Sequence, residues 1–526
     1  MRGRMRNSSK IFVLHASNDD YAAEIVAAGM RRSFTGRQVE KALWDCLTLK
    51  TAGVVMINPT DRQAPLLRDT LDSGGKVVIL GRVSDAIADC LGLVVRSDDH
   101  PDPDWAMASV APSEPYNASP VVVRYVSEHV LGRAAVVVRR PLRRYDYEDE
   151  WNNLGYGPIL CDDSPWAVSS IVDCNTVTCF GFLEDQYGKK LSAYAAIIDG
   201  PRGAALWINR AVGPIDSVEW CIVEEFFGSY RCDELACYPY LNEIPLGYSG
   251  GVTMRLDCDQ GVASAQMLFD LYSGLEIPFS VAISTGMEMT REDLKLLTKI
   301  VAKRGAVVSH SVNHFPNWGG SYDVAREEAR NSRAWIETNL PDAGLTVYAV
   351  SPFHQNPLFA VQALAETGYK GFVGGSIRND PEFLLGRAGR VPFIDPPIVS
   401  HSQQCMLHGD CFQRYGSSVD TYVESFMLHT QGGAIFGYLD HPFGPDYTYG
   451  WASEEKRLAV HEEFLSHLLS LDGLWWGSLV ACMDFLVTLG SANLWIDEPD
   501  RVRIDCDHSG SSLMLSATWK GKIIAP

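Results

Sequence analysis

The sequence predicts a multidomain α/β protein whose C-terminal half is built from repeated strand–helix units. Three observations lead to this fold class. The chain has 526 residues, which is too long for a single hydrophobic core. Apolar residues make up 46% of it and aromatic residues 10%, as in ordinary globular proteins. Apolar β-like runs alternate with helical stretches near the N-terminus and again after residue 259, which is typical of parallel sheets covered by helices.

Residues 1–110 are predicted to form a Rossmann-like or flavodoxin-like domain. Strands are expected at 11–14, 54–57 and 77–80, and helices at 21–32 and 66–71. The turn after the first strand reads HASNDD and lacks the glycines of a dinucleotide site. Neither Cys46 nor Cys90 stands in a glycine-flanked nucleophile elbow. We therefore expect this domain to be non-catalytic.

Residues 111–245 are predicted to form a β-rich accessory domain. Strands are expected at 121–125, 134–138, 176–182 and 204–208. Two cysteine pairs, Cys174 with Cys179 and Cys232 with Cys237, have a spacing that a metal could use. Core thiols are the more frequent interpretation, because free cysteines are among the most buried residues.

Residues 246–490 are predicted to form a barrel of strand–helix units. Strands are expected at 279–283, 347–350, 372–373 and 434–438. Thr290 and Asp293 have the spacing of a capping box, and Gly305 is expected at the C′ position of the helix that they start. A longer helix is expected at 322–339. In such barrels the site lies at the carboxyl ends of the strands.

The C-terminal end contains the most apolar window and a different pattern after it. Residues 474–489 include Asp484 and are expected to form a buried strand and helix rather than a membrane span. Residues 493–525 alternate apolar and polar side chains, so 491–526 is expected to be a small antiparallel β appendage.

Charge and cysteine usage restrict partners and location. A formal net charge of −20 argues against nucleic acid or an anionic membrane as a partner. The N-terminal apolar run is too short for a signal-peptide core, and no window is long enough for a transmembrane helix. The 13 cysteines are scattered without a compact framework, which favours reduced thiols. A cytoplasmic location is expected, and the oligomeric state is left open.

Two motifs at the ends of predicted strands combine carboxylates with imidazoles. In RLDCDQG, Asp257 and Asp259 stand at i and i+2 of a strand and therefore face one side. In SHSVNH, one turn of chain would bring His310 and His314 within reach of a single cation. One carboxylate with two imidazoles leaves coordination positions open for hydrolysis, and the other carboxylate is free to activate water. The spacing alone does not decide which carboxylate is the ligand.

Both motifs resemble those of the polysaccharide deacetylases, the family-4 carbohydrate esterases. RLDCDQG is similar to the first motif of the branch with R-[IL]-D-x-D, and SHSVNH to the second motif, H-[ST]-x-x-H. The resemblance covers about residues 246–489 and implies a distorted (β/α) barrel. It also implies that Asp257 is the catalytic base and that Asp259, His310 and His314 hold one divalent ion. Zn²⁺ is the expected ion, with Co²⁺, Ni²⁺ and Mn²⁺ as alternatives.

The third family motif, R-x-P-[YF], is matched in part. Pro352 and Phe353 are present, and the resemblance implies that the Phe353 backbone N–H is an oxyanion donor. Ala349 stands where the family has an arginine that steadies the catalytic aspartate. His354 and Arg390 are two alternatives for replacing this arginine.

The fourth and fifth motifs supply the remaining expected residues. Asp395 in RVPFIDPP resembles the fourth-motif acid, which orients the catalytic histidine. IFGYLDHPF resembles the fifth motif with Asp440 inserted, and it implies that His441 is the general acid that protonates the leaving amine. Shortly after His441 stand three aromatic residues that would either stack on a sugar face or pack as a loop, namely Tyr447, Tyr449 and Trp451.

The resemblance implies a metal-dependent N-deacetylase acting on an N-acetylated sugar. Without an export signal, a nucleotide-linked or lipid-linked intermediate of surface-glycan biosynthesis is a more natural substrate than a finished glycan polymer. Two alternatives stay open. One is a metal-dependent hydrolase of another amide or ester. The other is a non-catalytic carbohydrate-binding protein that keeps the fold, which the missing arginine favours.

Overall fold

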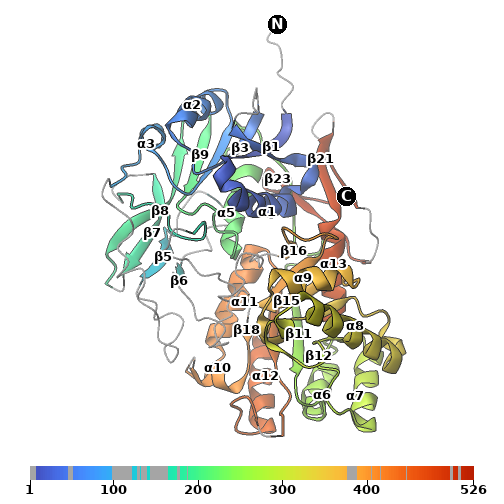
Figure 1. The fold of residues 1–526 in the computed structure, drawn as a ribbon. Helices are drawn as coiled ribbons and strands as arrows, with labels where there is room; N and C mark the ends of the chain where they lie inside the picture. The colour runs from blue at the N-terminus through green and yellow to red at the C-terminus, as the bar shows by residue number, and fades with distance from the viewer. Residues whose placement is uncertain are drawn as a thin grey trace.

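The structure is a computed structural model, shown in Figure 1. It describes residues 8–44, 51–96, 121–126, 131, 139–141, 164–173, 178–185, 187–375, 388–403, 405–414, 416–445, 447–497, 501–506 and 511–526. The strand expected at 134–138, the start of the one expected at 176–182, and both Cys46 and Cys174 lie outside the described residues.

A nine-stranded sheet forms the N-terminal half, in the order β2-β1-β3-β4-β9-β8-β7-β5-β6. The first five strands of this order are parallel neighbours: β2 (Val39–Leu43), β1 (Ser8–His15), β3 (Thr51–Ile57), β4 (Lys76–Leu80) and β9 (Ala204–Ile208). Counted along the chain, the parallel part has the order 2-1-3-4-5 of flavodoxin-like sheets. Among the described residues, the helices of this half are α1 (Asp20–Gln38), α2 (Ala64–Asp72), α3 (Asp85–Leu91) and α5 (Cys221–Gly228).

The same sheet continues across the boundary predicted between residues 110 and 111. Its antiparallel part consists of β8 (Lys190–Asp199), β7 (Cys179–Asp185), β5 (Val121–Tyr125) and β6 (Arg139–Pro141). β9 lies beyond that boundary in sequence, yet it pairs in parallel with β4. Both strands are buried along their whole length, KVVIL and AALWI, as expected for central strands covered on both faces. The predicted boundary between residues 110 and 111 thus falls, in sequence, between strands of one sheet.

A ten-stranded sheet forms the C-terminal half, in the order β16-β17-β15-β14-β13-β12-β11-β19-β18, with β20 also paired to β11. All of its pairs are parallel except that of β16 with β17. The strands are β11 (Gly250–Cys258), β12 (Ser280–Ile283), β13 (Ala306–Ser309), β14 (Tyr348–Val350), β15 (Gly371–Gly375), β16 (Gly389–Arg390), β17 (Val399–Gln403), β18 (Cys405–Met406), β19 (Phe436–Asp440) and β20 (Leu474–Trp476). Residue 404 alone separates β17 from β18, so the chain joins strands near opposite edges of the sheet and the sheet curves back on itself.

Helices cover the outside of this curved sheet (Figure 1). They are α6 (Gln266–Gly274), α7 (Arg291–Ala302), α8 (Tyr322–Asn339), α9 (Leu358–Glu366), α10 (Gly409–Arg414), α11 (Asp420–Gly432), α12 (Glu454–Leu469) and α13 (Leu479–Gly490). The predicted capping box of Thr290 and Asp293 is present at the start of α7. The prediction for Gly305 was wrong, because Arg304 has the left-handed backbone, with φ 63°. Gly305 is needed for another reason: a Cβ there would lie 2.1 Å from the carbonyl oxygen of Phe279.

The C-terminal residues form antiparallel pairs, as predicted. β21 (Ala492–Asp497) pairs with β22 (Arg501–Cys506), and β23 (Ala517–Trp519) with β24 (Lys522–Ile524). β23 also pairs with β10 (Tyr240–Leu241), and β21 runs beside α1 (Figure 1). Thr35 of α1 and Leu494 of β21 exchange two hydrogen bonds between side chain and backbone. The C-terminal strands thus connect the two halves.

Cysteines and hydropathy complete the description. Every cysteine that the structure describes is a free thiol, and Cys237 is buried with its Sγ 3.1 Å from Nζ of Lys76. Over the described residues, no helix combines the length and the apolar character that crossing a bilayer requires.

Candidate metal centre

A cavity of about 420 Å³ lies at the carboxyl ends of strands in the C-terminal sheet. Its walls come mainly from the segments that follow β11, β13, β14 and β19. Parallel strands end at one edge, so residues far apart in sequence meet there. The lining residues are Asp257, Asp259, Gln260, His310, Asn313, His314, Phe353, His354, His441, Tyr447 and Tyr449. Of the residues for which the family motifs imply a metal-binding or catalytic role, only Asp395 is not among them.

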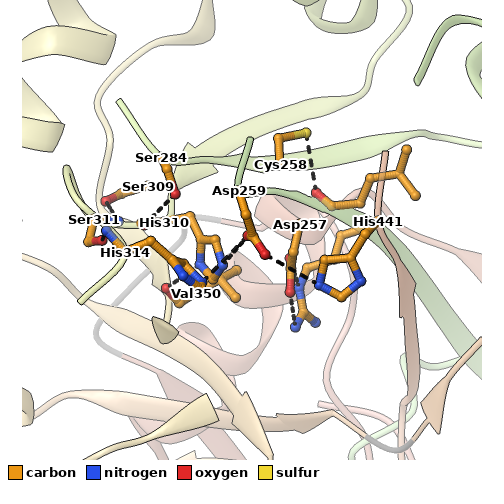
Figure 2. Close-up of polar contacts among 12 residues, drawn as sticks. Asp257, Cys258, Asp259, Ser284, Ser309, His310, Ser311, His314, Val350 and His441 are labelled. Carbon is orange, nitrogen blue, oxygen red and sulfur yellow. Dashed lines mark hydrogen bonds and ion pairs between the residues drawn. The ribbon is translucent and has the colours of Figure 1, made fainter. Parts of the chain in front are cut away.

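Asp259, His310 and His314 form the candidate metal-binding group (Figure 2). Oδ1 of Asp259 lies 3.2 Å from Nε2 of His310 and 3.5 Å from Nε2 of His314. One ligand atom from each residue lies within 4.8 Å of the others. Across the residues described, no second group of three His, Cys, Asp or Glu side chains has this property.

Backbone contacts aim the two imidazoles. Nδ1 of His310 lies 2.9 Å from the carbonyl oxygen of Val350, which leaves Nε2 for Asp259. After β13 the chain makes a tight turn in which Ser311 and His314 have φ of 67° and 52°. The His314 N–H donates to Oγ of Ser311 at 3.0 Å. The two imidazole centroids are therefore only 4.6 Å apart.

The donor set fits a divalent ion. Oδ1 of Asp259 is buried and has no hydrogen-bond partner within the described residues. Burial would raise the pKa of Asp259, but His310 and the neighbouring imidazoles outweigh it and lower the pKa. Burial, with a smaller effect from His310, lowers the pKa of His314 to about 4, so its ring is neutral at pH 7. A buried carboxylate oxygen beside a neutral imidazole nitrogen is the kind of donor set that Zn²⁺ binds.

Asp257 is held by Arg255, the arginine of the first motif, to which the sequence had suggested no role. Nε and Nη2 of Arg255 donate to Oδ1 and Oδ2 of Asp257 at 2.7 and 3.1 Å. The two side chains are 3% and 1% exposed, so this is a buried bidentate ion pair. Burial would raise the pKa of Asp257, but Arg255, His310 and His441 lower it, so the carboxylate is ionised at neutral pH.

Neither alternative for the missing arginine is correct. His354 is buried in the cavity wall, and burial lowers its pKa to about 3, so it has no charge to offer at neutral pH. Arg390 belongs to β16, packs near Gly490 at the end of α13 and is not a lining residue. Arg255 has the contact that was expected of them. The rule that places Asp257 and Asp259 on one strand face also places Arg255 there.

His441 lies beside the candidate metal ligands. Its Nε2 is 3.8 Å from Oδ2 of Asp259. Its ring stacks on Tyr449 with centroids 4.2 Å apart and 9° between the planes. The ring of His408 meets it edge-on, with centroids 5.3 Å apart. Within the described residues, Nδ1 of His441 has no hydrogen-bond partner.

Asp395, predicted to orient His441, is not among the residues that line the cavity. It is exposed, and its backbone N–H and carbonyl exchange hydrogen bonds with the Gln362 side chain on α9. The buried acid near His441 is Asp440, which accepts the His441 backbone N–H at 2.8 Å. Both oxygens of Asp440 also accept from Nε1 of Trp451, so this carboxylate fixes the backbone and not the imidazole.

The aromatic residues after His441 divide into two kinds. Trp451 is 3% exposed and packs against Phe412, so it is not available to stack on a sugar. Tyr447 and Tyr449 line the cavity, and Tyr447 is 44% exposed. Phe353 also lines the cavity. Its backbone has φ 51°, and its ring centroid lies 4.6 Å from that of His314.

Comparison with known proteins gives limited similarity. No family model and no curated protein matches the sequence. The carbohydrate deacetylase Agd3 aligns over 97% of this chain and 93% of its own, at 10% identity and a TM-score of 0.41. A candidate polysaccharide deacetylase from Mycobacterium smegmatis aligns over 46% and 92%, at 12% identity and a TM-score of 0.36. A family-4 carbohydrate esterase pseudoenzyme aligns over 48% and 73%, at 14% identity and a TM-score of 0.31. These scores establish neither a shared fold nor an activity, so the functional assignment depends on the side chains of the site.

Proposed function

We propose that this protein is a metal-dependent N-deacetylase that removes an acetyl group from an N-acetylated sugar. One observation carries the proposal. A single cavity contains a cation-binding set, an ionised carboxylate and an imidazole, which are the ligands, base and acid that amide hydrolysis needs. Its volume of about 420 Å³ is within the range of small-molecule sites.

The residues divide the work as follows. Asp259, His310 and His314 would hold the divalent ion, which when bound polarises a carbonyl group and makes water more acidic. Asp257, held by Arg255, accepts a proton from the attacking water. The Phe353 N–H donates to the acetyl carbonyl oxygen, which becomes an oxyanion as water adds to the carbonyl carbon. His441 gives a proton to the amine nitrogen as the C–N bond breaks, which releases acetate and the free amino sugar.

We extend the proposal to the rest of the chain. The curved C-terminal sheet supports the distorted (β/α) barrel expected for residues 246–490. Residues 1–110 would do no chemistry of their own, since they lack phosphate-binding glycines and a nucleophile elbow. Asp19 and Asp20 at the start of α1 also oppose binding of a dinucleotide phosphate. The substrate would be a nucleotide-linked or lipid-linked intermediate of surface-glycan biosynthesis in the cytoplasm. Among the alternatives, the non-catalytic protein loses its main argument, because Arg255 holds Asp257.

The test combines metal analysis with substrate screening. Purified protein should contain about one divalent ion per chain, and it should release acetate from N-acetylated sugars. Chelation should abolish acetate release, and re-addition of Zn²⁺ or Co²⁺ should restore it. Full activity after verified metal removal would contradict the proposal. Faster hydrolysis of simple esters or other amides would favour the alternative hydrolase, and a metal-loaded protein that releases no acetate would favour the non-catalytic one.

A further inference from the structure

Tyr449 contacts both the proposed general acid and a proposed metal ligand of the candidate site. Its ring lies flat on His441, with centroids 4.2 Å apart and 9° between the planes. Its hydroxyl donates to Oδ2 of Asp259 at 3.1 Å. The side chain is 9% exposed and lines the cavity. One residue thus touches the proposed general acid and a proposed metal ligand.

The backbone of His441 is fixed, but its ring depends on aromatic neighbours. The His441 N–H donates to Asp440, and its carbonyl accepts from Nη1 of Arg457 at 2.7 Å. No hydrogen bond to Nδ1 is found among the described residues. Apart from the 3.8 Å approach of Nε2 to Oδ2 of Asp259, the ring is set by the face of Tyr449 and by His408, which meets it edge-on, two arrangements that aromatic rings prefer.

The two oxygens of Asp259 have different neighbours. Oδ1 faces the Nε2 atoms of His310 and His314, whereas Oδ2 accepts the Tyr449 hydroxyl. A carboxylate that offers one oxygen to an ion leaves an additional coordination position for substrate. The hydroxyl therefore favours binding through Oδ1 alone.

The loop holds Tyr449 in this place against its own backbone preference. Tyr449 has φ 51°, in the left-handed region that non-glycine residues rarely adopt. Its carbonyl accepts the Asp410 N–H at 3.2 Å, and the side chain of Tyr447 donates to the Asp410 carboxylate. Nε2 of Gln413 donates to the Gly450 carbonyl at 2.6 Å. Contacts on both sides of Tyr449 therefore fix this conformation and with it the position of the side chain.

We infer that Tyr449 is a positioning residue with two separable roles, an inference that builds on the proposed deacetylase function. The hydroxyl holds Asp259 in the orientation that presents Oδ1 to the ion. The ring holds the His441 imidazole with Nε2 toward the leaving amine. The hydroxyl therefore contributes to metal affinity, and the ring contributes to the rate of the chemical step.

Two substitutions separate the roles. Tyr449→Phe keeps the ring and removes the hydroxyl, so metal affinity should fall about 10–100-fold while kcat at saturating metal stays close to wild type. Tyr449→Leu removes both, so metal affinity should fall similarly and kcat at saturating metal should fall on the order of 10²-fold with KM little changed. Calorimetric titration of the metal-free protein with Zn²⁺ measures the first effect without reference to activity. Acetate release at saturating Zn²⁺ measures the second.

Tyr348→Phe is the matched control. It also removes a hydroxyl that donates to a half-buried carboxylate, that of Asp484. Tyr348 and Asp484 both lie outside the cavity. This variant should keep wild-type metal affinity and kcat.

Each result decides one role. Wild-type metal affinity in Tyr449→Phe would overturn the hydroxyl role, and wild-type kcat in a folded Tyr449→Leu would overturn the ring role. If Tyr449→Leu does not fold, Tyr449→Trp is the second variant, because it keeps a flat ring at this position. Its kcat at saturating metal should be within a few-fold of that of Tyr449→Phe. A much lower kcat in a folded Tyr449→Trp would overturn the ring role. If the wild-type protein releases no acetate, the proposed function fails and the ring role with it, whereas the metal titration still decides the hydroxyl role.

Discussion

At the residue scale, the two carboxylates at the end of β11 have different partners, so neutralising each should have a different effect. Asp257 is paired with Arg255 and is not in the candidate metal-binding group. Asp257→Asn should therefore keep the metal and lower kcat on the order of 10²–10⁴-fold, because it removes a proton acceptor. Elemental analysis and acetate release on the same sample measure both effects.

Asp259→Asn should show the opposite pattern. It replaces an anionic ligand with a neutral one, so metal affinity should drop and added metal should partly restore activity. Titration of activity against Zn²⁺ distinguishes this from the Asp257 variant. Loss of the ion in Asp257→Asn and its retention in Asp259→Asn would reverse the two assignments.

The two carboxylates and the two histidines of the candidate metal centre were predictable from short spacings, whereas other contacts in the cavity depend on the fold. Asp257, Asp259, His310 and His314 came from spacings within two motifs, which a strand and a tight turn convert into geometry. Arg255 was also within reach of the same spacing rule. Tyr449 was named only as an aromatic residue that would stack on a sugar or pack as a loop. Its stacking on His441 was not predictable, because it depends on a left-handed backbone and on Asp410, which no local pattern in the sequence indicates.

At the element scale, helix α8 fixes the loop that presents the two histidines. Glu328 of α8 is 5% exposed, and its Oε2 accepts the N–H groups of Val312 and Asn313, each at 2.8 Å. Its Oε1 accepts Nδ2 of Asn313 at 2.6 Å. This one carboxylate therefore satisfies three donors between His310 and His314.

Glu328→Gln should loosen that loop while it preserves the fold. The amide offers one acceptor oxygen where the carboxylate has two, so metal affinity should fall about 10–100-fold. Glu327→Gln on the exposed side of the same helix is the control and should bind metal like the wild type. Calorimetric titration with Zn²⁺ compares the two. Equal affinity in both variants would show that α8 does not position the histidines.

Elements defined by local pattern were predicted well, and their long-range pairing was not. Helix α8 has the predicted bounds, because its apolar spacing and its Ser321 cap are local features. The same holds for β9, whose bounds were predicted although its place was not. β9 lies more than a hundred residues after β4, and nothing within AALWI indicates which strand it joins. Because of that pairing, the predicted boundary between residues 110 and 111 falls between strands of one sheet.

At the scale of the whole molecule, residues before the C-terminal sheet complete its hydrogen bonding. Glu243 is 1% exposed and accepts the backbone N–H groups of Ile435 at 2.9 Å and Ala388 at 3.1 Å. Nε of Arg32 on α1 donates to the Ala388 carbonyl at 2.8 Å. A chain that begins near Ser249 would lack all of these groups, so its stability should be well below that of the full chain.

Glu243→Ala tests this connection without a truncation. Each buried N–H left without a partner costs about 1–3 kcal/mol, so the free energy of unfolding should fall by a few kcal/mol. Metal affinity and kcat should be unchanged, because Glu243 does not line the cavity. Urea unfolding followed by circular dichroism measures the first, and calorimetry with acetate release the second. A stability equal to that of the wild type would show that the two halves are not coupled through this residue.

Buried neutral histidines outside the metal centre should make the whole molecule sensitive to acid. His401 on β17 is 1% exposed and His429 on α11 is fully buried. Burial lowers the pKa of His401 to about 3 and that of His429 to about 4. Both values lie below the ordinary pKa of about 6.5, so between these limits the unfolded chain binds protons that the folded chain does not.

The free energy of unfolding should therefore fall as the pH drops from about 6.5 toward 4, and this contribution should be fully present above pH 6.5. One pKa unit corresponds to about 1.4 kcal/mol, so each histidine should account for about 2–3 kcal/mol by pH 4.5. His401→Gln keeps a polar side chain that does not titrate, and it should remove one share of the pH dependence while leaving that of His429. Urea unfolding at several pH values, with the metal-free protein to exclude ligand release, measures the slope for both chains. A slope in His401→Gln as steep as in the wild type would show that His401 is protonated in the folded protein or that its burial is relieved before unfolding.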